Sequence, residues 1–305
     1  MIIDQLKQEA KAHGNQLLVL PIERLQNLKD DLDTFRAENS LNSFQQWIMN
    51  DMYQLNLPDA EFQLRSILLI ALPHAPYAYV EFHRNGQLYS FRSLVVANFQ
   101  ETYQYLMNIL EPQGYHILHT EGLPLKRLAA SSGLASYGRN NICYVEGMGS
   151  NVLFDVYFSD LPAADMAWSG PKLSDACHSC TYCMRACPTG AIRETPFVID
   201  NMRCLSFLNE VPDPFPDWLS PSVHHTLYDC LRCQEGCPMN RDHWGEPIGP
   251  VVFDEEETEL LLSGSPYKAF SPALKEKSDL LGMAQWIDAI PRNLKVLMEQ
   301  TILTQ

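Results

Sequence analysis

Eight of the nine cysteines in this chain lie between residues 177 and 237, where they form two runs. The first run, residues 177–188, has the spacing Cys-x2-Cys-x2-Cys-x3-Cys-Pro. In the second, an isolated Cys204 precedes residues 230–238, which read Cys-x2-Cys-x3-Cys-Pro. Thiolates at these spacings are typical ligands of two 4Fe-4S clusters. The sequence therefore predicts that electrons pass through this protein or are stored in it.

The order of the cysteines also predicts which thiolate binds which cluster. The first run has the spacing of bacterial ferredoxins, in which the fourth cysteine ligates the other cluster. The x2 gaps let successive thiolates converge on one cube, whereas the x3-Cys-Pro step turns the chain toward the neighbouring cube. The predicted ligands of cluster one are Cys177, Cys180, Cys183 and Cys237, and those of cluster two are Cys187, Cys204, Cys230 and Cys233.

Two other uses of clustered cysteines compete with this interpretation. Cys-x2-Cys pairs also build structural zinc sites with four thiolates. A zinc ribbon needs two pairs for each ion, however, and not a triple followed by x3-Cys-Pro. A secreted disulfide framework fits less well, because the chain is too long to need covalent staples and its cysteines are confined to one part of it. Iron-sulfur ligation is favoured, with structural zinc as the open alternative.

Composition and charge narrow the classes of partner. With 305 residues and 46% hydrophobic content, the chain can bury one large core or two moderate ones. A formal net charge of -15 disfavours a nucleic acid as a large partner, because a phosphate backbone is repelled. The N-terminal sequence has neither a basic segment before a long apolar stretch nor a run able to span a bilayer. We expect a cytoplasmic protein without membrane contact.

Hydrophobic patterns before residue 165 mix strands with helices. The dipeptide Asn85-Gly86 between two alternating runs predicts a hairpin, since both turn positions need positive φ. Predicted helices cover residues 3–12, a polar stretch ending near 48, 94–110 and 124–132; predicted strands cover 16–21, 65–73, 115–118, 142–145 and 152–158. This mixture favours an α+β domain over a strictly alternating doubly wound sheet.

Changes in composition predict three parts of the chain. Residues 1–165 form the α+β domain, and a linker rich in Pro, Ala and Ser leads into a two-cluster domain at residues 166–250. A proline-rich insert separates Cys204 from Cys230, which is tolerable because loop-closure entropy grows slowly with length. Residues 251–305, with DEEETELLL and LLGMAQWIDAI, are expected to be helical and to pack on the other two parts.

Residues 120–141, TEGLPLKRLAASSGLASYGRNN, resemble a stretch of the epoxyqueuosine reductase family. That stretch has an acidic residue, a proline three positions later, a short helix and Gly-Leu-Gly-x-x-Gly-Lys-Asn. The segments CHSCTYCMRACPTGAI and CLRCQEGCPMNRD, with Cys204 between them, are similar to the same family in order and spacing. The resemblance covers about residues 65–245.

The resemblance implies a fold, cofactors and an electron path. The fold is a three-layer cobalamin-binding-type domain, nitroreductase-like and related to reductive dehalogenases, followed by a bacterial ferredoxin-like two-cluster module. A donor such as ferredoxin or flavodoxin would reduce two 4Fe-4S clusters, and these would supply cobalamin, which reduces a substrate. The expected activity is that of an iron-sulfur, cobalamin-dependent reductase.

The resemblance also assigns site residues. Glu121 stands where the family has an aspartate proton donor, so it is the implied catalytic acid; otherwise it is a carboxylate stabilised near a helix start. The implied cofactor contacts are Gly133, Gly138, Arg139 and Asn140, a stretch that as a bare pattern reads as an ordinary tight turn. Ala135 and Arg139 replace a glycine and a lysine of the family. Lys126 and Arg127 either contact a cofactor tail or are solvated, and solvation is favoured; Cys143 is interpreted as a small buried hydrophobe.

The departures from the family concern the substrate. The Arg-Tyr-Ala segment expected before the long helix is absent, and SFRSLVVANF stands there. The sequence also lacks the C-terminal helical repeats with which longer members hold tRNA. Together with the acidity, this makes tRNA an unlikely partner and predicts a small-molecule or macromolecule-attached substrate that loses oxygen or halogen. The alternatives are an electron-transfer or activating protein without its own corrinoid, and a scaffold whose clusters are structural.

Overall fold

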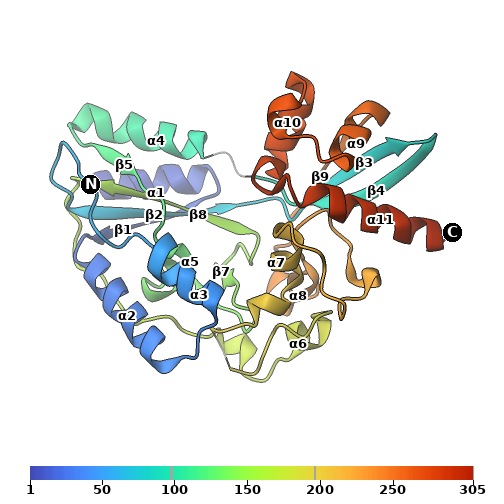
Figure 1. Ribbon diagram of the computed structural model, residues 1–305. Helices are drawn as coiled ribbons and strands as arrows, with labels where there is room; N and C mark the ends of the chain where they lie inside the picture. Colours follow the sequence, from blue (N-terminus) through green and yellow to red (C-terminus); the bar gives the residue numbers. More distant parts are fainter. Residues whose placement is uncertain (97–98, 196, 305) are drawn as a thin grey trace. The chain divides into compact units, whose positions relative to one another are not determined.

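The computed structural model describes residues 1–96, 99–195 and 197–304 and divides into two compact units (Figure 1). Unit 1 comprises Met1–Pro73, Asn98–Gly138 and Ile142–His178. Unit 2 comprises His74–Ala97, Arg139–Asn141 and Ser179–Gln305.

Unit 1 is built on a four-stranded antiparallel sheet. The strand order is β1 (Gln16–Pro21), β2 (Ser66–Pro73), β8 (Val152–Ser159) and β5 (Ile117–His119). Every residue of β2 except its final proline is buried, which matches its nearly continuous run of apolar side chains. A strand of this kind needs cover on both faces, because successive side chains point in opposite directions.

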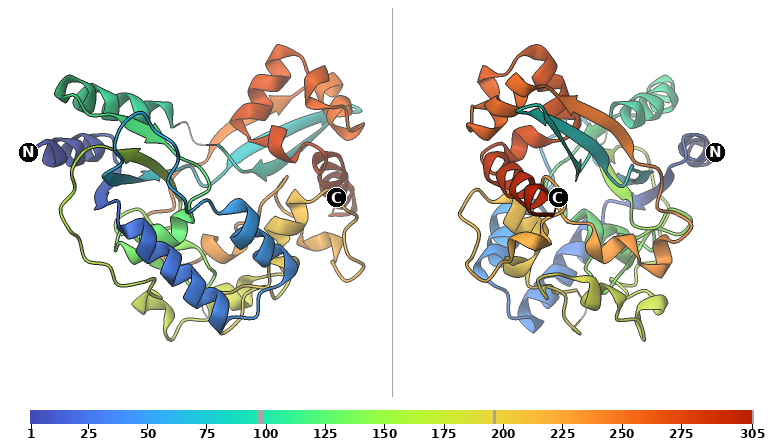
Figure 2. Two further views of the ribbon diagram at one scale, coloured as in Figure 1. Left: turned by 60° about the vertical axis from the view of Figure 1, so that its left-hand side comes forward. Right: turned by 90° about the vertical axis from the view of Figure 1, so that its right-hand side faces the viewer.

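Helices provide that cover. On one face α1 (Ile2–Ala12) and α4 (Gln100–Leu110) pack on Leu68, Ile70 and their neighbours. On the other face α2 (Arg24–Glu38) and α5 (Leu125–Ser131) pack on Ile67 and Leu69, as Figures 1 and 2 show. Shorter elements complete the unit: α3 (Ser43–Trp47), the π-helical turn Ile48–Met52, β6 (Ser136–Tyr137) and β7 (Cys143–Tyr144).

Unit 2 has a three-stranded sheet in the order β4, β3, β9. Strands β3 (Ala78–Arg84) and β4 (Gln87–Ser93) form the predicted hairpin, with φ of 51° at Asn85 and 72° at Gly86. Strand β9 (Ile248–Phe253) pairs with β3 in parallel, and the Phe82 and Phe253 rings stack at 4.7 Å. The core of this sheet is completed by α9 (Glu255–Leu262), α10 (Pro272–Leu280) and α11 (Ile290–Thr304).

The cysteine segment of unit 2 is mostly turns. Its helices are short: α6 (Tyr182–Ala186), α7 (Leu205–Glu210) and α8 (Arg232–Glu235). Arg92 of β4 pairs with Glu235 of α8, and its carbonyl accepts the backbone N–H of Leu227 at 2.7 Å. The hairpin thus holds the second cysteine run from outside the run itself.

The expectation of a mixed α and β fold with a cluster-binding segment is confirmed. Two helix predictions were wrong in extent. Helix α4 begins at Gln100 and not at residue 94, and LLGMAQWIDAI is not one helix. It contains the 3₁₀ turn Met283–Trp286 after Gly282, whose φ of 64° breaks the helical path.

The predicted domain limits, residues 1–165, 166–250 and 251–305, remain a prediction. The pairing of the hairpin with β9 is a feature that sequence reasoning missed, since we expected the hairpin to belong with residues 1–165. Among the described residues, no helix is long and apolar enough to cross a membrane.

Candidate iron-sulfur centre and glycine loop

The structure brings together the four thiols assigned to cluster two. Burial raises the pKa of Cys230, and the Cys204 and Cys187 thiols raise it further. Burial also raises the pKa of Cys233, with Cys230 and Cys204 acting in the same direction. Charges act on one another this way only at short range, so Cys187, Cys204, Cys230 and Cys233 share one neighbourhood.

The donor chemistry of this neighbourhood fits an iron-sulfur cube. Cys187 Sγ accepts the backbone N–H of Ala191 at 3.3 Å and lies 3.5 Å from Thr189 Oγ1. Burial acts to raise the pKa of Cys187, but these bonds, with those from the backbone of Thr189 and Ile192, leave it lowered overall. Hydrogen bonds to sulfur favour the thiolate, the form that ligates iron. Among the residues described, no three His, Cys, Asp or Glu side chains are arranged around a single metal ion.

Cys204 reaches this group through the insert that follows it. Arg203 Nε donates to the carbonyl of Thr189 at 2.9 Å, which ties the residue before Cys204 to the Cys187 loop. At the other end of the insert, Asn209 and Thr226 donate to the carbonyl of Asp229 at 3.1 and 2.8 Å. These bonds hold Asp229 at a φ of 68°, the left-handed region that few non-glycine residues adopt, directly before Cys230.

Two carboxyl groups share one hydroxyl next to Cys230. Ser206 Oγ lies 2.9 Å from Glu210 Oε1 and 2.8 Å from Asp229 Oδ1. A serine hydroxyl has a single proton, so both contacts are hydrogen bonds when one carboxyl is protonated. Burial raises the pKa of Glu210 to about 7, and the nearby Asp229 adds to the rise. Burial also raises the pKa of Asp229.

A close contact between the two runs joins the segments of Cys183 and Cys237, two of the residues assigned to cluster one. Gly236, next to Cys237, has no room for a side chain because a Cβ there would meet the ring of Tyr182, next to Cys183. Cys183 is buried and Cys180 and Cys237 are half-buried. In unit 1, Cys177 is buried at the end of the 3₁₀ turn Asp175–Cys177.

The glycine loop divides between the two compact units. In unit 1, Gly133 is exposed with a φ of 82°, and the backbone N–H of Gly138 donates to the carbonyl of Ile142 at 2.7 Å. In unit 2, Arg139 and Asn140 contact the cysteine segment. Their side chains, assigned by resemblance to a cofactor, donate hydrogen bonds to backbone carbonyls of both cysteine runs.

Glu121 follows β5 in unit 1, and its side chain is exposed. Its carboxylate has no hydrogen-bond or ionic partner within the described ranges. Gly122, with a φ of 85°, fixes the backbone beside it: a Cβ there would lie 3.0 Å from Gln54 Cγ and 3.1 Å from the carbonyl of Met52. The N–H of Gln54 donates to the carbonyl of Gly122 at 2.9 Å. Sequence reasoning missed Gly122, although a glycine directly after the candidate acid was the signal.

An aspartate and a histidine also lie close to Glu121 in the chain. His119 Nε2 is 3.1 Å from Oδ1 of the buried Asp155, whose Oδ2 accepts the Tyr157 hydroxyl at 2.7 Å. Burial raises the pKa of Asp155, while the bonds from Tyr157 and His119 oppose that rise. This pair was missed because strand pairing, and not sequence proximity, brings residues 119 and 155–157 together.

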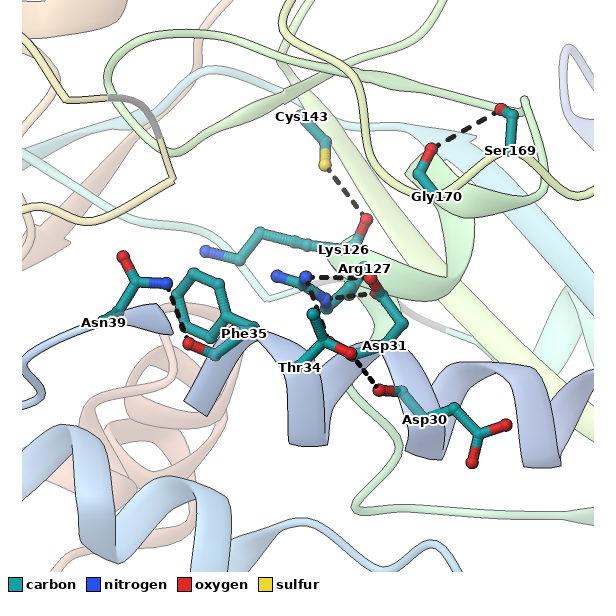
Figure 3. A network of polar contacts seen from close by, with 10 residues as sticks. All are labelled: Asp30, Asp31, Thr34, Phe35, Asn39, Lys126, Arg127, Cys143, Ser169 and Gly170. Carbon is teal, nitrogen blue, oxygen red and sulfur yellow. Dashed lines mark hydrogen bonds and ion pairs between the residues drawn. The ribbon is translucent and has the colours of Figure 1, made fainter. Parts of the chain in front are cut away.

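The helix after Glu121 is anchored by an ion pair (Figure 3). Arg127 donates to both carboxylate oxygens of Asp31, at 2.5 and 3.0 Å, and its guanidinium lies over the Phe35 ring at 4.5 Å. The prediction of a solvated Arg127 was wrong, since it holds α5 against α2. Cys143 is buried, as expected; burial raises its pKa to about 12, so its thiol is inert.

Known proteins match this chain over the cysteine segment and over longer stretches. Residues 176–240 match the family model described as 4Fe-4S double cluster binding domain. The epoxyqueuosine reductase of Burkholderia pseudomallei is 30% identical over 141 residues, which cover 44% of this chain and 34% of that protein. The Escherichia coli epoxyqueuosine reductase is 33% identical over 181 residues, covering 53% and 46%. The aligned stretch therefore spans less than half the length of either relative.

Solved structures show the same fold over a longer stretch. The epoxyqueuosine reductase of Bacillus subtilis gives a TM-score of 0.65 at 21% identity, over 97% of this chain and 81% of that one. An epoxyqueuosine reductase solved with an epoxyqueuosine-modified tRNA stem loop gives 0.62 at 20% identity, over 97% and 80%. The chain is therefore similar in fold to epoxyqueuosine reductases, and its residues 176–240 match a 4Fe-4S double cluster binding domain.

Proposed function

We propose that this protein is an iron-sulfur reductase that passes electrons through two 4Fe-4S clusters to a corrinoid, which reduces a substrate. The observation that carries the proposal is the convergence of Cys187, Cys204, Cys230 and Cys233 from distant parts of the sequence. The hydrogen bonds to Cys187 support a ligating thiolate there. A one-electron donor of the ferredoxin or flavodoxin type would load the clusters.

The corrinoid would be held by unit 1. A corrinoid, when bound, supplies a metal centre that collects single electrons and delivers them to a substrate as a pair. Residues on that side fit such a role: Glu121 presents an exposed carboxylate, and the backbone at Gly133 is open, since a Cβ placed there would meet no atom within 4 Å. Glu121 would give a proton to the reduced substrate, and Gly122 would position its backbone. Residues 1–165 would then be the three-layer, nitroreductase-like substrate domain.

The substrate we propose is not queuosine tRNA. One similar structure contains an epoxyqueuosine-modified tRNA stem loop, which makes tRNA the partner to test first. The net charge of -15 works against binding a phosphate backbone. A small molecule, or a group carried on another macromolecule, that loses oxygen or halogen is the substrate class that fits this charge. Binding of such a stem loop below about 0.1 mM at moderate salt, steepening as salt is lowered, would contradict this part of the proposal.

A second candidate function is electron transfer to another protein, without a corrinoid bound to this chain. Arg139 and Asn140 favour it, because side chains assigned by resemblance to the cofactor contact the cysteine segment. The missing Arg-Tyr-Ala segment favours it as well. In this version Glu121 has no catalytic role.

One experiment separates the two functions. The protein is purified without oxygen, its iron and sulfide are counted, and its absorption spectrum is followed while cobalamin is added. Eight irons with a saturable change in the cobalamin spectrum are expected for the reductase. Eight irons without that change would leave the electron-transfer function, and a zinc content in place of iron would reject both.

The role of Glu121 is tested in the cobalamin-bound protein. Glu121→Gln should retain both clusters and cobalamin binding but lose about 10²-fold or more in turnover, the usual worth of a general acid. Glu111→Gln, at an exposed position of the same unit, is the matched control and should keep normal turnover. Equal turnover of the two variants would remove Glu121 from the mechanism.

A further inference from the structure

We infer that the exposed indole of Trp218, with Arg203 against its ring, is the docking contact for the partner that supplies electrons to the clusters. That partner is a small one-electron carrier protein, and it meets this chain through an apolar contact close to Cys204. The inference rests on the proposed iron-sulfur function and deepens it, since it assigns the electron donor to a surface of unit 2.

Two large apolar side chains of the cysteine segment are exposed, and both lie close to Cys204 in the chain or through a contact. Met202 and Trp218 are each 46% exposed. Within residues 177–195 and 197–240, no other Val, Leu, Ile, Met, Phe, Tyr or Trp side chain is exposed. Single exposed apolar residues are common on protein surfaces, so the position of these two carries the argument. Met202 is two residues before Cys204, and Trp218 contacts Arg203, the residue directly before it.

The insert holds Trp218 on a fixed base. Its neighbour Leu219 is buried in a cluster with Leu205 and Leu208, and the Leu219 backbone N–H donates to the carbonyl of Pro216 at 2.9 Å. Four prolines lie between residues 212 and 221, and each fixes its own φ. An aromatic side chain on a rigid base loses little conformational entropy when a partner covers it. The exposed indole is therefore prepared for a contact.

Arg203 connects Trp218 to two cysteines assigned to cluster two. Its guanidinium carbon lies 4.4 Å from the centre of the Trp218 ring. Its Nε donates to the carbonyl of Thr189 at 2.9 Å, and Thr189 Oγ1 is 3.5 Å from Cys187 Sγ. Arg203 is also joined to Cys204 by a peptide bond. A carrier that covers Trp218 would thus be separated from these two cysteines by a single side chain, which is the short path that fast electron transfer needs.

The charges around this contact are balanced, although the whole chain carries a net charge of -15. Arg193 pairs with Asp200 at 2.6 Å, and the exposed Asp217, next to Trp218, offsets the charge of the exposed Arg203. A balanced surface neither strongly attracts nor strongly repels a charged carrier, so docking depends on the apolar contact. Trp, Met and Arg are enriched in protein interfaces, and transient redox complexes bury small areas, so a few such residues are enough.

The docked step moves one electron. The carrier is oxidised, cluster two is reduced, and no atom or proton is transferred. Trp218 and Arg203 are neither oxidised nor reduced, since they only hold the carrier in place. A change at Trp218 therefore affects reduction by a protein carrier but not by dithionite, a small reductant that needs no docking surface.

The test follows reduction of the anaerobic, iron-loaded full-length protein by stopped-flow absorbance. Reduced flavodoxin, reduced ferredoxin and dithionite serve as three separate reductants. Trp218→Ala should lower the second-order rate constant with a protein carrier about tenfold and weaken calorimetric binding of the oxidised carrier by the same factor. Met202→Gln, at an exposed side chain, should lower both by a smaller factor. Iron content and the rate with dithionite should not change, and added salt should have little effect.

Leu88→Gln is the matched control. Leu88 is an apolar side chain of β4 in the same unit, 48% exposed and outside the cysteine segment, so its replacement should leave every rate unchanged. The inference is overturned by normal carrier rates in Trp218→Ala and Met202→Gln, by an equal loss in Leu88→Gln or with dithionite, by a steep salt dependence, or by a wild type that neither carrier reduces. A wild-type protein without eight irons, or with clusters that dithionite does not reduce, would instead contradict the proposed function.

Discussion

The two cysteine groups of unit 2 are held in different ways. Cys180 and Cys183 lie at close spacing in the first run, and the contact of Gly236 with Tyr182 joins them to Cys237, with Arg139 bound to the carbonyl of Cys180. The second group depends on side chains from far along the chain. Cys204 joins Cys187, Cys230 and Cys233 only because hydrogen bonds within the insert and from α11 close a long loop. A contact between the two runs thus joins the first group, whereas the second also needs the insert and α11.

The largest effect is expected when a cysteine of the second group is replaced. Cys204→Ser removes the outlying ligand of cluster two, so we expect loss of about half of the iron and sulfide and retention of the cluster one signal. Cys143→Ser, at the buried cysteine outside both runs, is the control and should keep all of the iron. Full iron content in Cys204→Ser would show that the ligand assignment is wrong.

The next largest effect is expected from a substitution of Arg292 on α11, whose side chain contacts the insert. Its guanidinium donates to the carbonyls of Asp213 and Leu208 and lies over the Phe215 ring at 3.7 Å. Burial lowers the pKa of Arg292 to about 10, which shows how far this cation is removed from water. Arg292→Met should reduce the free energy of unfolding by about 3 kcal/mol, since charge-assisted hydrogen bonds and a cation–π contact are lost.

Anaerobic denaturant unfolding, followed by the loss of each cluster signal, measures this effect. Cluster two should disappear at lower denaturant concentration than cluster one in Arg292→Met. Lys295→Met lies on the same helix with an exposed side chain and should behave like the wild type. Simultaneous loss of both clusters in Arg292→Met would mean that α11 supports the whole unit and not the insert alone.

The first group is challenged at Gly236. Gly236→Ala places a methyl group against the Tyr182 ring, which must turn aside, so we expect a cost of about 2 kcal/mol and partial loss of cluster one. Gly190→Ala is the matched control: its φ of 66° strains any side chain, but no atom lies within 4 Å of the new Cβ. It should cost about 1 kcal/mol and leave the iron content unchanged. Equal iron loss in both variants would attribute the effect to backbone strain.

Features that depend on short stretches of sequence were predicted correctly. The hairpin at Asn85-Gly86, the buried strand β2 and the double-cluster domain each rest on a few consecutive residues or a fixed spacing. What the sequence did not reveal depends on long-range pairing. Strand β9 joins β3, and Asp31 on α2 captures Arg127 on α5, through contacts between residues far apart in the chain. No periodicity of a single segment encodes such partners.

Prediction of the candidate site from the sequence was limited in the same way. The eight cysteines were found from spacing, and the resemblance pointed to Glu121 and the glycine loop. The carboxyl pair Glu210 and Asp229 was not found, because only the fold brings Ser206 between them. Arg139 and Asn140 were singled out, yet a sequence pattern says only that these side chains are placed by a loop. Their partners on the cysteine segment come from the folded chain.

The smallest effect concerns Glu210, a buried carboxyl group close to the second group of cysteines. Burial raises the pKa of Glu210 from an ordinary 4.5 to about 7, so the folded protein holds a proton that the unfolded chain releases. The stability contributed by that proton is complete below pH 4.5 and is lost as pH rises through 7. Glu210→Gln carries no such charge and keeps a hydrogen bond to Ser206. It should gain stability relative to the wild type as the pH rises from 5 to 8, because over that range the wild type loses the stabilising effect of the proton on Glu210.

Thermal unfolding midpoints measured without oxygen at pH 5 and pH 8 give this difference directly. Glu246→Gln, at an exposed position of the same unit, should show no dependence on pH relative to the wild type. A gain for Glu210→Gln that is equal at both pH values would come from packing and not from a buried charge. A pH-dependent gain would instead establish that the second group holds a protonated carboxyl beside its thiolates. The first group, bound by the guanidinium of Arg139, has no counterpart to that carboxyl among its described hydrogen bonds.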